Sequence, residues 1–408
     1  MAASPQRREH AARLVLAIVL ADLVGFAIIV PQLSVSASRF GAQPLLIGFL
    51  AATDSALSAV LAPAWGRLSD RVGRRPVLLA GLAGSVLAAL LFGLAASVPL
   101  LFASRLVSGG LSGTVTVAQA ALADCSAPEK RARLLGLLGA AFGIAFTIGP
   151  AIGGLAAGLG ESAPGLLAAA IASVNLGLAW LALPETRQPA AATGWSRTVD
   201  ADAGAGAGLL PAIGVQGAAT LAFSAVYAAV PLWMQQALGF ARRDVSYAFA
   251  LTGLVGVVMQ GVLAARLSAR VGEGRAASVG AGALALGFGG LALGGMAPGW
   301  SGQLLVSLAL ASAGFNLLSP ALAAWVSRRT PASGQGAALG VLQSAGFVAR
   351  VAGPPTYGAT AEQLGLAAPF TAAAVAAAVA AVLGAARLGR AAPAVTSEGG
   401  RGGSSAPP

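Results

Sequence analysis

Residues 66–76, GRLSDRVGRRP, form a short basic segment between two long apolar runs of this 408-residue chain. A shortened copy, ARLSARVG, follows another apolar run at residues 265–272. A second match lies deeper in the two halves, where Gly136, Gly149 and Pro150 recur at the same spacing as Gly340, Gly353 and Pro354. Two matches at equivalent places indicate that the chain consists of two repeated halves with a site between them.

Working outward from this segment, twelve apolar runs are long enough to span a bilayer, which needs roughly 20 apolar residues. They cover residues 12–33, 44–65, 76–97, 99–123, 134–158, 164–183, 209–235, 245–265, 276–297, 301–326, 334–359 and 366–386. None alternates with the period of two that a membrane strand requires. The pattern predicts an all-α integral membrane protein whose twelve transmembrane helices form two pseudo-symmetric six-helix bundles.

The composition supports a membrane protein and argues against several other classes. Charged residues make up 10% of the chain and hydrophobic residues 57%, whereas a soluble domain has about 25% charged residues. The net charge is +11. The basic residues that produce it cluster in short loops between apolar runs, so we expect a lipid bilayer and not a nucleic acid as partner. With one cysteine, Cys125, one histidine, His10, and no nucleotide or catalytic motif, we expect no metal site, no cofactor and no enzymatic activity.

The basic residues predict the orientation in the membrane. The termini and the even-to-odd loops hold 20 Lys and Arg residues, whereas the odd-to-even turns hold three, Arg39, Arg242 and Arg243. Because positive loops stay in the cytoplasm, both termini are predicted to be cytoplasmic. We therefore expect a multi-pass protein of the inner (plasma) membrane.

Changes in polarity mark the predicted domain boundaries. Residues 1–184 form an N-terminal six-helix bundle and residues 209–388 a C-terminal one. The polar stretch between them, 185–208, is predicted to be a flexible cytoplasmic linker. The Gly/Ser/Pro-rich residues 389–408 are predicted to be a disordered cytoplasmic tail.

Four charged side chains fall inside the apolar runs, namely Asp22, Asp54, Arg105 and Arg350. Counting ~1.5 Å per residue places them roughly 10 to 18 Å below the outer face. A charge at that depth is costly, so it is usually paired, hydrated or functional. Burial raises the pKa of a carboxyl group and a nearby guanidinium lowers it, so such an acid can carry a proton. We expect Asp22, ahead of Asp54, to act in proton coupling; the alternative is a static ion pair.

Segment 66–76 resembles the loop between helices 2 and 3 of the major facilitator superfamily. The resemblance implies the major facilitator fold. It also implies a conformational latch in which Asp70 and Arg74 contact an acid at the end of helix 4, here Asp124. Gly66, Arg71 and Gly73 complete the motif. The second repeat has Ala269 and Glu273 in place of Asp70 and Arg74, so the predicted latch is asymmetric.

The fifth run resembles the antiporter motif of drug exporters, through Gly136, Gly149, Pro150, Gly153 and Gly154. Ala145 stands where that motif has Gly. Asp22 with Gly25 and Pro31, and Arg105 with Gly109 and Gly110, also resemble the drug and tetracycline exporters. The ninth run lacks the acid that tetracycline exporters carry there, so tetracycline itself is in doubt as a substrate.

Together these features favour a secondary transporter, which exports small amphipathic drug-like molecules in exchange for protons by alternating access. Gln119, Asn175 and Asn316 are either polar residues of the substrate cavity or hydrogen bonds between helices. Alternatives are a symporter or facilitator for a nutrient or metabolite, and a membrane receptor or scaffold that transports nothing. We expect a monomer with a small-molecule substrate, whose identity the sequence does not indicate.

Overall fold

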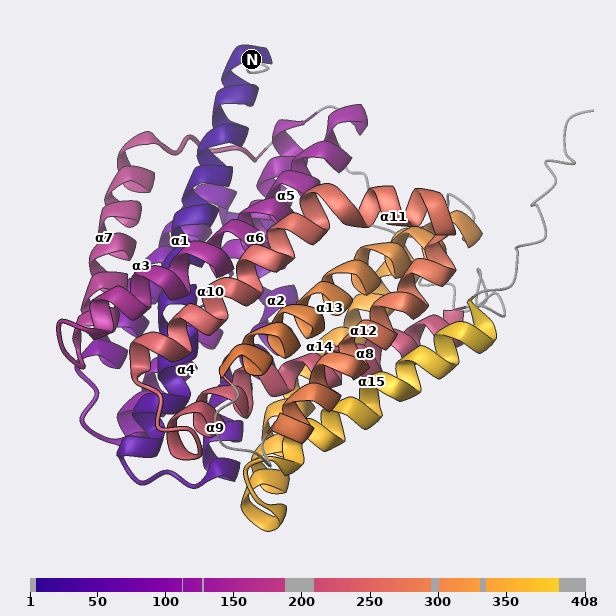
Figure 1. Cartoon of the computed structure of the whole chain (residues 1–408). Coiled ribbons are helices and arrows are strands. Elements are labelled where there is room, and N and C mark those ends of the chain that lie inside the picture. Colours follow the sequence, from indigo (N-terminus) through magenta and orange to yellow (C-terminus); the bar gives the residue numbers. More distant parts are fainter. Residues whose placement is uncertain are drawn as a thin grey trace, which may run out of the picture.

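A computed structural model describes residues 5–111, 113–126, 128–187, 209–294, 301–330 and 335–388. Most of the predicted linker, from residue 188, and the predicted tail, from residue 389, lie outside these ranges. Figure 1 shows the helices of the first half, from indigo to magenta, beside those of the second half, from pink to yellow.

The first half contains seven helices in the described residues: α1 Pro5–Arg39, α2 Pro44–Val72, α3 Arg74–Gly93, α4 Val98–Gly110, α5 Thr114–Cys125, α6 Pro128–Ala157 and α7 Ala163–Ala182. Its core lies between α1, α3, α5, α6 and α7, with α2 packed on α4. The packed side chains are largely Ala, Val and Leu, and the small alanines among them let the helices approach closely.

The second half contains α8 Leu209–Ala228, α9 Val230–Gln236, α10 Arg242–Val258, the π-helix η1 Met259–Leu263, α11 Ala264–Val271, α12 Glu273–Gly294, α13 Ser301–Arg329, α14 Gln335–Leu364 and α15 Ala368–Arg387. Here α12 packs against α13 and α15, and α8 against α14 and α15.

Ten helical segments in the described part are long and apolar enough to cross a membrane. The long helices α6 and α14 occupy the two remaining positions of the predicted series. The predicted fold, twelve membrane-spanning helices in two bundles, is thereby confirmed.

The structure differs from the sequence prediction in three runs, which are not single uninterrupted α-helices. The fourth is broken between Gly110 and Gly113, where glycine favours the helix poorly, and the indole Nε1 of Trp65 donates to the carbonyl of Gly110 at 3.0 Å. The seventh is broken at Ala229, because Pro231 has no N–H to donate to the carbonyl of Tyr227. The eighth contains the π-turn η1.

The two halves meet mainly through the pairs α2–α14 and α6–α10, and α1 also packs on α8, α9 and α10. Four hydrogen bonds between the halves involve residues of the stretch 32–45. Gln32 Nε2 donates to Ser246 Oγ at 2.7 Å, and the backbone N–H of Leu45 donates to Glu362 at 3.3 Å. This stretch comprises the end of α1, the following turn and the start of α2. The halves are therefore hydrogen-bonded at one end of the molecule, which we call the turn end.

Gly48 of α2 lies at this junction. A Cβ atom there would overlap the carbonyl oxygen of Pro354 on α14. Only glycine allows the two backbones to approach so closely.

Candidate functional site

The structure brings the three predicted latch residues together at the end opposite the turn end. The Nε of Arg74 donates to Asp124 at 2.9 Å, and its Nη1 lies 2.6 Å from Asp70. Gly73, with φ of 108°, makes the turn from α2 to α3 that orients Arg74. All three charged residues belong to the first half, so the cluster joins α2, α3 and α5 within one bundle.

Glu185, just after α7, is a further member of this cluster that the sequence analysis missed. Its carboxylate accepts hydrogen bonds from the backbone N–H groups of Arg74 at 2.9 Å and Arg75 at 3.2 Å. It thus caps the positive end of α3. Arg187 Nη1 donates to the carbonyl of Arg71 at 2.8 Å. A Cβ atom at Gly66 would meet no other described group within 4 Å. The sequence did carry a signal for Glu185: it is an acid directly after an apolar run, on the same predicted side of the membrane as Arg74 and Arg75.

The second half carries a similar ion pair with its charges exchanged. Glu273, which occupies the repeat position of Arg74, lies 2.8 Å from Arg328 near the end of α13. Gly272, with φ of 86°, repeats the turn made by Gly73. The repeat therefore keeps the turn and the pair between neighbouring helices, and reverses the sign of each partner.

Asp22 lies between α1, α3 and α5. The hydroxyl groups of Ser85 and Thr114 lie beside its carboxylate. Its Oδ1 atom is buried and has no partner among the described residues. An acid with a buried, unsatisfied oxygen inside a spanning helix can take up a proton, since a protonated carboxyl no longer needs the missing donor.

Asp54 and Arg105 lie near one another where α2 packs on α4. The Oδ1 of Asp54 accepts a hydrogen bond of 2.5 Å from Ser108, and the charge of Asp54 acts on Arg105. Arg105 is 2% exposed and donates to Ser104 at 3.0 Å, while its Nε has no partner in the described part of the chain. The two charges attract each other without direct contact, because no pair within 4.0 Å forms between them.

Arg350 lies apart from these three residues, on α14. Its side chain is exposed, its guanidinium lies 5.5 Å from the ring centroid of Phe347, and its charge acts on Tyr227 of α8. The four charges inside the runs therefore form three separate groups. No ion pair joins any two of them in the described residues.

The antiporter-like motif places α6 between α1 and α10. Cβ atoms at Gly149 and Gly153 would lie 2.6 Å from Ala27 Cβ and 2.8 Å from the carbonyl oxygen of Ile28, both on α1. One at Gly154 would lie 2.8 Å from Ser246 of α10, in the other half. Gly136 lies in the first part of α6.

Pro150 of the same motif leaves the carbonyl of Phe146 without its helical donor. The backbone of α10 fills this place, since a Cβ atom at Gly253 would overlap that carbonyl oxygen. The motif thus lies at a close crossing of the two halves, with Phe146 beside it.

A chain of aromatic rings crosses between the halves at this point. Phe26 of α1 and Phe146 of α6 lie edge to face, with centroids 6.3 Å apart, and Phe146 lies 6.4 Å from Tyr227 of α8. Tyr227 continues the chain to Phe249 and Phe223, and Phe223 stacks on Phe315 at 4.3 Å. We call these six residues the aromatic bridge. The sequence analysis missed it, because the rings come from five helices at no regular spacing.

The three polar residues predicted for the substrate cavity or for hydrogen bonds between helices have different environments. Asn175 is buried and donates to the carbonyl of Ile18 at 2.9 Å, so it forms a hydrogen bond between helices. Asn316 accepts from Gln260 at 2.5 Å and donates to the carbonyl of Ser312 at 2.8 Å. Gln119 is exposed on α5.

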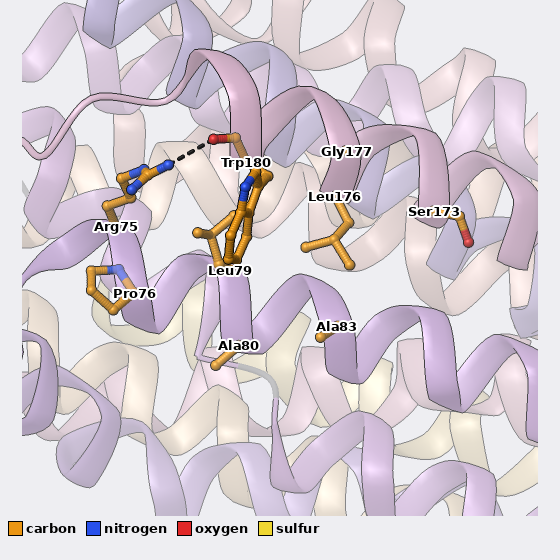
Figure 2. Close-up of a pocket in the computed structure, with 9 residues that line it drawn as sticks. All are labelled: Arg75, Pro76, Leu79, Ala80, Ala83, Ser173, Leu176, Gly177 and Trp180. Atoms are coloured by element: carbon orange, nitrogen blue, oxygen red, sulfur yellow. Dashed lines mark hydrogen bonds between the residues drawn. The ribbon is translucent and has the colours of Figure 1, made fainter.

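A groove of about 740 Å³ lies between α3 and α7, away from the contact between the halves. Figure 2 shows Arg75 at its end, where Nη2 donates to the carbonyl of Trp180 at 2.6 Å, and the side chains of Leu79 and Leu176 along it. This apolar surface belongs to one bundle, so it is not part of the contact between the halves.

Comparison with known proteins identifies the family. The model of the Major Facilitator Superfamily matches the chain twice, over residues 14–212 and 212–407. The chain belongs to this superfamily. It is therefore a multi-pass membrane protein and a transporter, not an enzyme.

Two relatives in sequence are tetracycline resistance proteins. The class G protein of Vibrio anguillarum is 32% identical over 363 residues, which are 85% of this chain and 89% of that protein. The class B protein of Escherichia coli is 29% identical, over 84% of this chain and 86% of that protein.

Solved structures share the fold. A bacterial homolog of the lysosomal transporter Spinster has a TM-score of 0.75 at 15% identity, covering 96% of this chain and 100% of that one. The human organic anion transporter MFSD10 has a TM-score of 0.67 at 24% identity, covering 94% and 100%.

Proposed function

We propose that this transporter exports small amphipathic, drug-like molecules in exchange for protons, by alternating access. One observation carries the proposal. The carboxylate of Asp22 lies inside a spanning helix, and its Oδ1 atom is buried without a hydrogen-bond donor among the described residues. Its relatives named tetracycline resistance proteins support an exporter of this kind.

The contacts between the halves support alternating access. Hydrogen bonds join α1 to α8 and α10, and α2 to α14. Tight backbone approaches at Gly48 and Gly253 join α2 to α14 and α6 to α10. These contacts must break for the turn end to open, and nothing covalent in the described residues opposes that. Movement of the bundles around a site between them is the general mechanism of such repeats.

We further propose that both termini are cytoplasmic, as the distribution of basic residues predicts. The turn end then faces outward, so the described arrangement is closed to the outside. A monomer suffices for this mechanism, because both bundles belong to one chain. Protons are the only coupling species that the proposal requires.

Sealed everted membrane vesicles with an imposed pH gradient test the proposal, using a panel of amphipathic fluorescent drugs. Asp22→Asn is expected to abolish uphill export and to leave downhill exchange of substrate, because the substrate site survives. Asp54→Asn tests the second candidate. Glu9→Gln is the matched control, since Glu9 is an exposed acid on the same helix, paired only with Arg13.

The possible outcomes separate the functions considered. Uphill export by Asp22→Asn and Asp54→Asn at the wild-type rate would refute proton coupling through these acids. Wild-type flux that moves no protons would indicate a facilitator, and no flux of either kind a scaffold. A static ion pair predicts instead that each single variant of Asp54 and Arg105 accumulates poorly and that the double variant recovers.

A further inference from the structure

We propose that the site between the halves takes planar aromatic molecules that carry a permanent or ionised anionic group. Arg350 binds the anion and the aromatic bridge contacts the rings. This inference rests on the proposed function and specifies its substrate class.

The internal repeat places Arg350 at the position that Phe146 occupies in the first half. Phe146 precedes Pro150 by four residues, and Arg350 precedes Pro354 by four residues. Each proline leaves the carbonyl of the earlier residue without its helical donor. The other bundle packs close to each kink, through Gly253 on the carbonyl of Phe146 and through Gly48 on the carbonyl of Pro354. Phe146 and Arg350 are therefore equivalent in the repeat, each four residues before a kinked crossing of the bundles.

Arg350 has no carboxylate partner within ion-pair distance among the described residues. The acids inside the spanning helices are held elsewhere, Asp22 by the hydroxyls of α3 and α5 and Asp54 by Ser108 on α4. The groups that face Arg350 are the ring of Phe347 and the phenol of Tyr227. An uncompensated cation inside a membrane protein is unfavourable. A ligand anion would supply the missing charge.

The aromatic bridge lies next to this cation. Tyr227 belongs to it and lies where α8 packs on α14: a Cβ atom at Gly353, three residues after Arg350, would overlap Ser224, three residues before Tyr227. Through Phe26 and Phe146 the bridge includes the first half, and through Phe249 and Phe315 the second. Aromatic side chains favour planar ligands through offset or edge-to-face contacts. A ring bound there would touch both bundles, so its binding would respond to their movement.

Two fluorescent probes of similar size and opposite permanent charge test this proposal: naphthalene-2-sulfonate and N-methylquinolinium. Transport into everted vesicles is measured for the wild type, Arg350→Gln and Arg350→Lys. For the sulfonate, Arg350→Gln is expected to raise the KM about 20-fold, the size expected for losing a hydrogen bond to a charged group. Arg350→Lys keeps the charge and should stay within about threefold of the wild type. The KM for N-methylquinolinium should not rise in either variant.

Equal changes for the two probes in Arg350→Gln would overturn the proposal, as would a wild type that prefers N-methylquinolinium. If the wild type prefers N-methylquinolinium but transports it uphill, the proposed function stands and only the anion site is refuted. If neither probe is transported, the proposed function is at fault. Equilibrium binding of the sulfonate to purified wild type and Arg350→Gln then still tests the anion site. If Arg350→Gln fails to fold, the comparison of the two probes in the wild type and Arg350→Lys decides.

Discussion

The ion pair between Arg74 and Asp124 should contribute measurably to the stability of the first bundle. The Arg74 side chain is 11% exposed and that of Asp124 is 25% exposed. Exposed pairs contribute about 0 to 1 kcal/mol, and loss of one partner from a buried pair costs about 3 to 5 kcal/mol. For this partly buried pair we expect a coupling free energy of about 2 kcal/mol, between those limits.

A double-mutant cycle of Arg74→Gln and Asp124→Asn measures this coupling. The chain's single cysteine, Cys125, directly follows Asp124 and is partly buried, so its reaction with a thiol reagent reports local opening of α5. Coupling of about 2 kcal/mol corresponds to a change of about 30-fold in the population of the open state. The cycle compares the rates of thiol modification of the wild type, the single variants and the double variant in detergent.

The charge-exchanged pair in the second half serves as the matched control. Arg328 is 74% exposed, so water screens its interaction with Glu273. Arg328→Gln and Glu273→Gln should therefore couple by less than about 1 kcal/mol, read from thermal unfolding because no cysteine lies nearby. Equal coupling in the two pairs, or none between Arg74 and Asp124, would refute the argument from burial.

Three further predictions concern topology, packing and capping. In a Cys125→Ser background, Ser162→Cys should react with an impermeant thiol reagent on whole cells and Ser196→Cys should not; the reverse pattern would invert the proposed orientation. Gly253→Ala should reduce transport at least about tenfold by forcing α6 and α10 apart, whereas Gly217→Ala, with open space around it, should not; equal activity would show that the close approach is unimportant. Glu185→Gln should lower the free energy of unfolding by about 1 kcal/mol by weakening the cap of α3, and an unchanged melting temperature would contradict that role.

The sequence predicted the fold well because the relevant signal is local. A spanning helix must satisfy its backbone internally, so each run of apolar residues is decided by its own composition. The breaks were missed for different reasons. The break at Ala229 has a local signal, Pro231, which run length and hydropathy alone do not register. The interruption after Gly110 is stabilised by Trp65 from another helix, and no pattern within run 99–123 shows that partner.

The same division applies to the candidate site. Asp70, Arg74 and Asp124 were found through a motif, and the structure brings them together, although their role as a latch stays a prediction. Asn175 was left open between two roles; its amide donates to the carbonyl of Ile18 of another helix, and a role in the substrate cavity stays a prediction. The aromatic bridge has no sequence signal, since its rings converge only through the crossing of five helices.

The two repeats share their turns and proline kinks and differ in chemistry at the residues one turn before the kinks. The turns at Gly73 and Gly272 are retained, and so are the proline kinks at Pro150 and Pro354. These features control how helices cross, and a two-state movement needs them in both halves. At the equivalent positions before the kinks, however, one half has Phe146 and the other Arg350. A symmetric pair of rings or of cations at those positions would fit only a symmetric ligand. One apolar ring opposite one cation instead fits a molecule with an apolar end and a charged end.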